Sequence, residues 1–333
     1  MGRLVVRVTT ALTVMLLVAL GSWSCSQASY SGKIESITVG MESTPVNSLI
    51  YIAEDQKLFA ANGLNVTIKE YASGLAATNG MMNGEVDIAT AAEFVIVGKA
   101  LAKESVVTLG SIDRFRHIHL IGRKDRGFDS VSDLKGKRIG VPLKTAAEFY
   151  LGRFLDLNRM SVGQVSLVDV SPAKSVDALV NGDVDAVVTW QPNVRAIEDR
   201  LGGEIVEWRP QGEQPTYCAA ISTSKWASEH PDLAKRFLAS LVQAEKYNAS
   251  HPNEARAIVQ KKLNYDDAYV AAIWPEHQLL VSLDQALVVA MEDQARWMMN
   301  NKLTDEKSMP DFLGNIYVDG LKTVAPASVN IIN

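Results

Sequence analysis

Val180–Ala186 (VNGDVDA) repeats with small changes the segment Met82–Ile88 (MNGEVDI), which lies 98 residues earlier in the chain. Ser73 and Ser171 stand at the same offset, each between an apolar stretch and a stretch of helical character. A serine at that place can cap a helix by accepting a backbone N–H bond, and the glycine of Asn-Gly can end the helix in the left-handed conformation. A second short strand follows in each copy, and strand alternating with helix is typical of a parallel, doubly wound sheet. The repeat therefore predicts an α/β protein with two similar lobes.

Two further strand-like stretches, Ile118–Arg123 and Tyr217–Thr223, flank the second copy of the repeat. They indicate that the chain crosses between the lobes twice, so the second lobe, 119–214, is inserted in the first, 33–118 plus 215–333. The two crossings would form the hinge of a two-lobed clamshell. Apolar periodicity predicts helices in the first lobe. The helices expected are 47–60, 233–248, 253–263, 266–273 and 283–300.

Residues 1–28 have the layout of a secretory signal peptide. Arg3 and Arg7 precede an apolar run over residues 11–20, and small and polar residues follow. The run is too short to span a bilayer comfortably. Two processing sites compete: a lipoprotein site at which Cys25 would be acylated, and ordinary cleavage after Ala28. We expect the mature protein in the periplasm or at the cell surface, lipid-anchored if Cys25 is modified.

Charge and cysteine content narrow the classes of function. The sequence has 33 Lys and Arg against 38 Asp and Glu, a formal net charge of −5. A protein that binds the phosphates of a nucleic acid needs a positively charged surface, so this charge argues against a nucleic-acid partner. Of the two cysteines, Cys25 lies in the signal peptide, so Cys218 is expected to be free and the fold to rest on its hydrophobic core. We expect a monomer that binds no nucleic acid.

Three separated motifs carry a resemblance to a known family. Ser132–Pro142 (SDLKGKRIGVP), Val180–Asp185 (VNGDVD) and Thr189–Pro192 (TWQP) occur in this order. The chain from Ile34 to about residue 303 resembles the nitrate, sulfonate and taurine group of periplasmic substrate-binding proteins, which also includes binders of the thiamine-precursor pyrimidine. The resemblance implies the type II periplasmic-binding fold, a small-molecule ligand held between closing lobes, and an ABC permease in the inner membrane as partner.

The resemblance and the geometry of open sheets place the ligand at the same loops, because such sheets bind ligands beyond the carboxyl ends of their strands. The residues expected to bind the ligand are Glu42, Ser43, Thr44, Ser73, Gly74, Ala92, Glu93, Lys144, Thr145, Ala146, Thr189, Trp190 and Gln191.

Each of these loops also has a purely structural interpretation. Ser73 and Thr145 can act as helix caps alone. Lys144 either adds positive charge ahead of a helix start, where it would attract an anion, or is a solvated surface lysine. Trp190, just after a strand, either stacks on the ligand or fills the core.

Acidic residues at these loops bear on the kind of ligand. Glu42, Glu93 and Glu148 all fall in or beside the expected site, and carboxylates there repel a bare anion. A zwitterion or a neutral hydrogen-bonding heterocycle therefore suits the site better than nitrate or a simple sulfonate.

An enzyme is the rival function. The same fold serves a pyrimidine synthase of yeast thiamine biosynthesis, which resembles these binders but has a cysteine-rich site, whereas this chain keeps Cys218 alone in its mature part. The sequence has no Gly-x-Ser-x-Gly elbow or P-loop, and its histidines lack the spacing of a His-Glu-x-x-His metal site. The histidines are His117, His119, His230, His251 and His277. We expect no catalytic residues, no metal and no cofactor.

Overall fold

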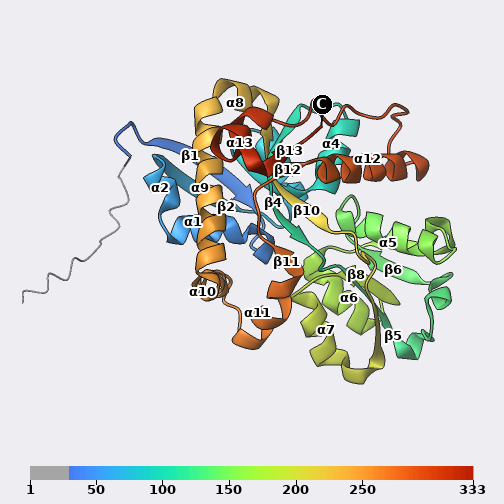
Figure 1. Ribbon diagram of the computed structural model, residues 1–333. Coiled ribbons are helices and arrows are strands. Elements are labelled where there is room, and N and C mark those ends of the chain that lie inside the picture. Colours follow the sequence, from blue (N-terminus) through green and yellow to red (C-terminus); the bar gives the residue numbers. More distant parts are fainter. Residues whose placement is uncertain (1–29, 333) are drawn as a thin grey trace, which may run out of the picture.

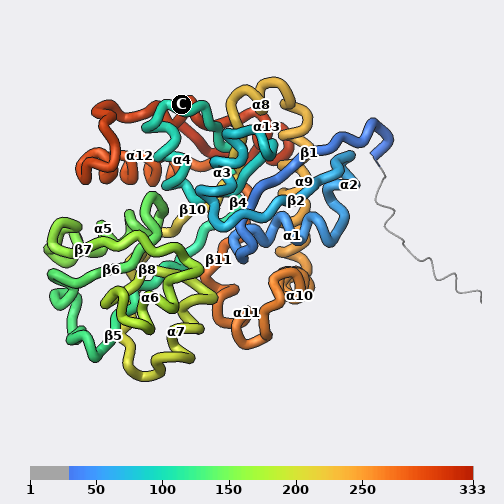
Figure 2. The backbone as a smooth tube through the Cα atoms, turned by 180° about the vertical axis from the view of Figure 1, so that it is seen from behind, coloured from blue at the N-terminus to red at the C-terminus, as the bar shows by residue number. Residues whose placement is uncertain are grey.

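The computed structural model of the protein describes residues 30–332 (Figure 1). The predicted signal peptide, with Cys25 and Ala28, lies outside these residues. The described chain forms two lobes, each built on its own sheet and covered by helices. The first described residues lie at the end of the first lobe that is remote from the second lobe (Figure 2).

The sheet of the first lobe has six strands in the order β11-β4-β10-β3-β1-β2. β1 pairs in parallel with β2 and β3, whereas β10 runs antiparallel between β3 and β4. β10 therefore returns the chain from the inserted lobe to the sheet of the first lobe. The strands are β1 (Glu35–Met41), β2 (Leu64–Glu70), β3 (Ile88–Ala92), β4 (Val106–Phe115), β10 (Thr216–Thr223) and β11 (His277–Gln278).

The second sheet has five strands in the order β7-β6-β8-β5-β9. β6 pairs in parallel with β7 and β8, and β5 lies antiparallel between β8 and β9. Both sheets thus have the same plan: a parallel core and an antiparallel strand where the chain enters or leaves the lobe. The strands are β5 (His119–Arg123), β6 (Arg138–Val141), β7 (Ser166–Asp169), β8 (Ala186–Thr189) and β9 (Ile205–Trp208).

Helices cover both sheets, and the long α9 packs against α1 and α13 on the first lobe. None of the helices in the described residues is both long enough and apolar enough to cross a membrane. The first-lobe helices are α1 (Ser48–Asp55), α2 (Leu58–Ala61), α3 (Gly74–Met82), α4 (Glu93–Leu101), α8 (Ser224–Glu229), α9 (Pro231–Ser250), α10 (Pro252–Leu263), α11 (Asp267–Ile273), α12 (Gln285–Asn300) and α13 (Val318–Val324). The second-lobe helices are α5 (Ala146–Leu157), α6 (Ser175–Asn181) and α7 (Asn193–Leu201).

Short 3-10 turns and a two-stranded sheet complete the described chain. The 3-10 turns are Pro45–Asn47, Lys124–Arg126, Val131–Leu134, Val162–Gln164, Pro172–Lys174, Gly202–Glu204, Trp274–Glu276 and Pro326–Ser328. The small parallel sheet pairs β12 (Leu283–Asp284) with β13 (Val329–Asn330).

The sequence repeat has a structural cause in both lobes. Its aspartate accepts hydrogen bonds from the neighbouring parallel strand: Asp87 Oδ2 from the Thr38 N–H at 2.7 Å and Asp185 Oδ2 from the Arg138 N–H at 2.9 Å. Its glycine ends the helix at a positive φ of 77° at Gly84 and 79° at Gly182, a conformation that glycine adopts at little cost. The motif therefore ends a helix and sets the start of the next strand in each lobe.

The two crossings between the lobes are joined by one buried side chain. Gln211 accepts a hydrogen bond from the Ile118 N–H at 2.8 Å and donates to the Phe115 carbonyl at 3.1 Å and to Thr216 Oγ1 at 3.0 Å. Both passages of the chain are thus fixed to each other at the hinge, and the predicted two-lobed clamshell with two hinge crossings is confirmed.

One predicted helix is interrupted. The expected helix over 47–60 is divided into α1 and α2, because Lys57 adopts a left-handed conformation with φ of 56°. The helices expected after Pro231 are present as α9, α10, α11 and α12.

Candidate functional site

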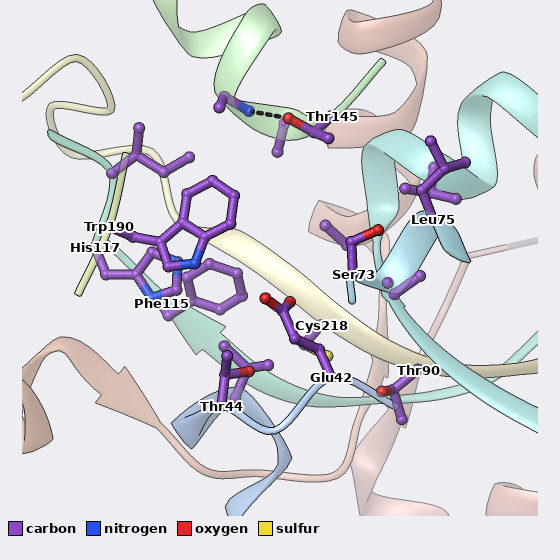
Figure 3. A pocket seen from close by; sticks show the side chains of 18 of the residues that line it. Glu42, Thr44, Ser73, Leu75, Thr90, Phe115, His117, Thr145, Trp190 and Cys218 are labelled. Carbon is purple, nitrogen blue, oxygen red and sulfur yellow. Dashed lines mark hydrogen bonds between the residues drawn. The ribbon is translucent and has the colours of Figure 1, made fainter. Parts of the chain in front are cut away.

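The main pocket lies where strand ends and helix starts from both lobes meet (Figure 3). The space between its lining atoms is about 690 Å³, including the part open to solvent, which is the size of small-molecule sites. The first lobe supplies the ends of β1 and β3 and the start of α3, and the second lobe supplies the start of α5 and the residue after β8. The lining residues are Glu42, Thr44, Val46, Asn47, Ser73, Gly74, Leu75, Thr90, Ala91, Ala92, Val95, Phe115, His117, Ile118, Thr145, Ala146, Ala147, Trp190 and Cys218.

Many of the residues expected at the site line this pocket, and some do not. Those that line it are Glu42, Thr44, Ser73, Gly74, Ala92, Thr145, Ala146 and Trp190. Gln191 lines a smaller adjoining pocket instead. Ser43, Glu93, Lys144 and Thr189 line neither pocket.

Three of these expected residues have structural contacts elsewhere. The Glu93 side chain is fully buried and accepts hydrogen bonds from the Tyr217 N–H at 3.0 Å and Gln294 Nε2 at 2.8 Å, so it points into the core at the start of α4. The hydroxyl of Thr189 is buried within 3.1 Å of Ser175 Oγ. Lys144 is exposed, and its backbone N–H donates to Glu148 Oε2 at 2.7 Å, so Glu148 is also occupied outside the pocket.

Glu42 supplies the acidic group of the pocket. It follows β1 directly, and its carboxyl group points into the space between Ser73, Thr145 and Trp190 (Figure 3). Its carboxylate oxygens accept no hydrogen bond from the residues that the structure describes. Burial raises the pKa of this carboxyl to about 7, because a charge loses solvation when it leaves water. A donor or a cation on a ligand would therefore stabilise the ionised form.

An aromatic wall stands opposite the start of α3. The His117 ring lies 4.3 Å from the Phe115 ring and 6.0 Å from the Trp190 ring, centroid to centroid, and is stacked on Trp190 at an interplanar angle of 19°. Burial, with the nearby charges of His277, His119 and Arg209, lowers the pKa of His117 well below its ordinary value. His117 is therefore a neutral ring with one N–H donor and one acceptor.

Two helix starts face the same space. Ser73 Oγ accepts from the Ala76 N–H at 3.2 Å at the start of α3, and Thr145 Oγ1 accepts from the Ala147 N–H at 3.3 Å at the start of α5. Both residues thus cap a helix and line the pocket at once. Helix starts carry partial positive charge, and the lining residues include no lysine or arginine side chain within residues 30–332.

Phe115 and His117 were missed by the sequence prediction. The prediction began the first crossing at Ile118 and considered His117 only among the histidines that lack the spacing of a metal site. Their position next to the predicted crossing could have placed them at the site, because a segment that connects two lobes must pass beside the space between them. Within the described residues there is no cluster of three or more metal-ligating side chains.

Comparison with protein families gives a match over residues 44–255 to the family described as NMT1/THI5 like. The chain belongs to the NMT1/THI5-like family. The resemblance drawn from the three sequence motifs is thereby confirmed.

Several proteins are similar to this member of the NMT1/THI5-like family. A protein of Brucella abortus to which a binding role is ascribed is 26% identical, over 66% of this chain and 69% of its own. The taurine-binding periplasmic protein of Escherichia coli is 24% identical over 61% and 63%. The formylaminopyrimidine-binding protein of Halalkalibacterium halodurans is 24% identical over 75% and 76%.

Solved structures establish the fold of this NMT1/THI5-like chain. The alkanesulfonate-binding protein SsuA of Xanthomonas axonopodis, bound to MOPS, superposes with a TM-score of 0.73 at 18% identity, covering 86% of this chain and 99% of that one. The desulfurization enzyme DSZB superposes with a TM-score of 0.60 at 15% identity, covering 87% and 99%. Since both a binding protein and an enzyme share the fold, the function must be argued from the pocket.

Proposed function

We propose that the protein is the extracytoplasmic solute-binding component of an ABC importer, and that its ligand is a small planar nitrogen heterocycle such as an aminopyrimidine. The observation that carries the ligand class is the unpaired carboxyl of Glu42 in a pocket walled by the rings of Phe115, His117 and Trp190. An amino group or protonated ring nitrogen can donate to this carboxylate. The ring itself can stack on the aromatic wall.

A zwitterionic amino-sulfonate is the second candidate ligand. The starts of α3 and α5 offer backbone N–H groups and positive partial charge to a sulfonate, while Glu42 would take the ammonium group. A simple alkanesulfonate or nitrate has no donor or cation for Glu42, so the carboxylate in its ionised form would oppose its binding.

An enzyme acting on a pyrimidine precursor is disfavoured by the chemistry of the pocket. Cys218 lines the pocket, but burial raises the pKa of its thiol well above the ordinary value. The thiolate is the nucleophilic form of cysteine, so Cys218 is a poor nucleophile here. The proposal therefore assigns binding and no covalent step to these residues.

Export, a permease partner and lobe movement complete the proposed function. The relatives that act in the periplasm or bind solutes support an extracytoplasmic location. We propose that residues 33–118 plus 215–333 and residues 119–214 move as two domains about the hinge, closing on the ligand for presentation to the permease. Fractionation and fatty-acid labelling, with and without Cys25→Ala, would test export and lipidation.

The ligand class is tested by a thermal-shift survey of the mature protein. The panel contains aminopyrimidines, taurine, ethanesulfonate, nitrate and amino acids. A ligand at about 100 times its dissociation constant stabilises the native state by about 2.7 kcal/mol, a rise of roughly 5 °C in melting temperature for a chain of this size. We expect such a rise with an aminopyrimidine. A rise with ethanesulfonate or nitrate alone would refute the proposed ligand class.

A further inference from the structure

An arginine beside the hinge, Arg209, joins the two lobes. It follows β9 in the second lobe, and its Nη2 donates a hydrogen bond to Glu276 Oε1 of the first lobe at 2.6 Å. Glu276 ends the 3-10 turn before β11, and its other oxygen, Oε2, is buried without a hydrogen-bond partner in the described part of the chain. Arg209 therefore supplies the positive charge that pairs with this carboxylate and ties the turn to the second lobe.

The position of Arg209 depends on a buried histidine. Arg209 Nη1 lies 2.6 Å from Nε2 of His119, a residue that is 5% exposed at the start of β5. An arginine side chain donates hydrogen bonds and accepts none, so Nε2 of His119 is the acceptor. The imidazole proton is therefore on Nδ1, which donates to Glu207 Oε1 of β9 at 2.7 Å. This arrangement requires a neutral His119.

A second proton on the His119 ring is incompatible with this contact. In the charged imidazole both ring nitrogens are donors, so Nε2 would direct an N–H at the Arg209 guanidinium, and two positive charges would meet at hydrogen-bond distance. Glu207 can keep its hydrogen bond with the charged ring. The Arg209 side chain is 51% exposed and can move into solvent. Glu276 would then lose its charged partner, and the turn would no longer be held to the second lobe.

The other titratable groups at this part of the hinge have partners or stay neutral. His277 Nδ1 pairs with Asp113 Oδ2 at 2.5 Å, and both side chains are buried. Burial, with the nearby charges of His277, His119 and Arg209, keeps the pKa of His117 well below its ordinary value. On β8 the residue opposite His119 is Thr189, which does not titrate. The titratable or charged groups around His119 are Glu207, Arg209, Glu276, His277, His117 and Asp113.

We propose that His119 and Arg209 form an acid-sensitive switch that holds the two lobes together. The contact from Arg209 to Glu276 is made while His119 is neutral, and it is lost as the pH falls, because the charged ring displaces Arg209. Histidine is the side chain whose charge ordinarily changes between pH 5 and 8, which sets the range of the test. The inference does not depend on which ligand the main pocket binds.

Nitrogen-15 NMR of the unmodified protein, labelled in its histidines, tests the protonation of His119. The His119 resonances are assigned by their absence from His119→Gln. At pH 7.5 we expect the proton on Nδ1 and none on Nε2, and in acid we expect both nitrogens to be protonated. A proton on Nε2 at pH 7.5 would overturn the proposal.

The distance between the lobes tests the consequence of protonation. Spin labels on cysteines introduced at two exposed residues, Asp55 of α1 and Asp199 of α7, are measured by pulsed EPR without ligand at pH 7.5 and pH 5.0. Cys218 is buried. We expect acid to increase the population of a second, more open arrangement of the lobes several-fold. Arg209→Ala should show this increase already at pH 7.5.

His119→Gln separates this switch from other titrations, because glutamine gains no charge in acid. Glu42 and Glu93 also titrate near pH 7, but they are present in every variant. His119→Gln should therefore lose most of the response to pH. His251→Gln is the matched control, since His251 is an exposed histidine at the junction of α9 and α10, and it should respond as the unmodified protein does.

Two results would overturn the switch. One is an interlobe distance in the unmodified protein that is the same at both pH values, and the other is an equal response to acid in His119→Gln and the unmodified protein. If His119→Gln fails to fold, Arg209→Ala decides the question. A distance in Arg209→Ala at pH 7.5 that equals that of the unmodified protein would then contradict the proposal.

Discussion

At the scale of single residues, Glu42 is the group whose ionisation shapes the pocket. Its pKa is raised by burial from an ordinary 4.5 to about 7. A carboxyl with a raised pKa in the folded state contributes full stability below pH 4.5, and that contribution is lost as the pH rises through 7. The loss amounts to on the order of 3 kcal/mol for a shift of this size.

Glu42→Gln removes this titration and gives a pH-dependent prediction. Without ligand, the variant should be more stable than the unmodified protein above pH 7, and the difference should vanish below about pH 4.5. Glu93 also has a pKa raised to about 7 by burial, but it is present in both proteins and cancels in the difference. Urea denaturation at pH 4.5 and pH 8 measures the effect. A difference of the same size at both pH values would mean that Glu42 is not buried as described.

Trp190 is the aromatic residue that the sequence and the pocket geometry both place at the site. It is partly buried and stacks on His117. Removing a large aromatic anchor from a binding surface typically costs roughly 2 kcal/mol or more, about thirtyfold in affinity. Trp190→Ala should therefore weaken ligand binding about thirtyfold and lower the unliganded melting temperature only slightly. Unchanged affinity with much earlier melting would show that Trp190 is a core residue instead.

At the scale of elements, the contact between α5 of the second lobe and α4 and α12 of the first holds the lobes together. Phe149 lies 6.0 Å from Phe94 and 5.5 Å from Trp297, centroid to centroid. Gly152 leaves the room that Trp297 needs, since a Cβ on Gly152 would stand 2.2 Å from Trp297 Cζ2. The glycine therefore permits the two lobes to approach at this point.

Gly152→Ala should disturb this contact between the lobes. Overpacking of this kind typically costs about 1–3 kcal/mol, so we expect a lower melting temperature and weaker ligand binding. Gly98→Ala is the matched control, because a Cβ there would lie at an ordinary 3.7 Å from Met298 Cε, also on a helix. The control should be neutral or stabilising, as alanine favours helix. Equal effects of the two substitutions would contradict the account of the contact.

The elements also show what the sequence could and could not predict. The repeat was visible because the same Asn-Gly turn and the same aspartate serve both lobes, at Asp87 and Asp185. The direction of the Glu93 side chain could not be predicted from the sequence. It depends on hydrogen bonds from Tyr217 and Gln294, which are far away in the sequence. The interruption of the predicted helix 47–60 at Lys57 could not be predicted either, since lysine has no strong preference for the left-handed conformation.

At the scale of the whole molecule, the site exists only because the fold brings two lobes together. Ser73 and Thr145 cap helices in different lobes and line one pocket, and Glu42 and Trp190 are likewise contributed by separate lobes. Closure would therefore assemble the acidic group, the aromatic wall and the helix starts around one ligand. We propose that Glu42 pairs with a nitrogen group of that ligand.

Calorimetric titration of the unmodified protein and of Glu42→Gln with 4-amino-2,5-dimethylpyrimidine and with ethanesulfonate tests this claim most directly. At pH 7.5 the unmodified protein should bind the pyrimidine and give no heat of binding with ethanesulfonate. Glu42→Gln should lose at least tenfold in affinity for the pyrimidine, since a charge-assisted hydrogen bond typically contributes about 1.5–3 kcal/mol. Tight binding of ethanesulfonate by the unmodified protein, strengthened in Glu42→Gln, would contradict the account.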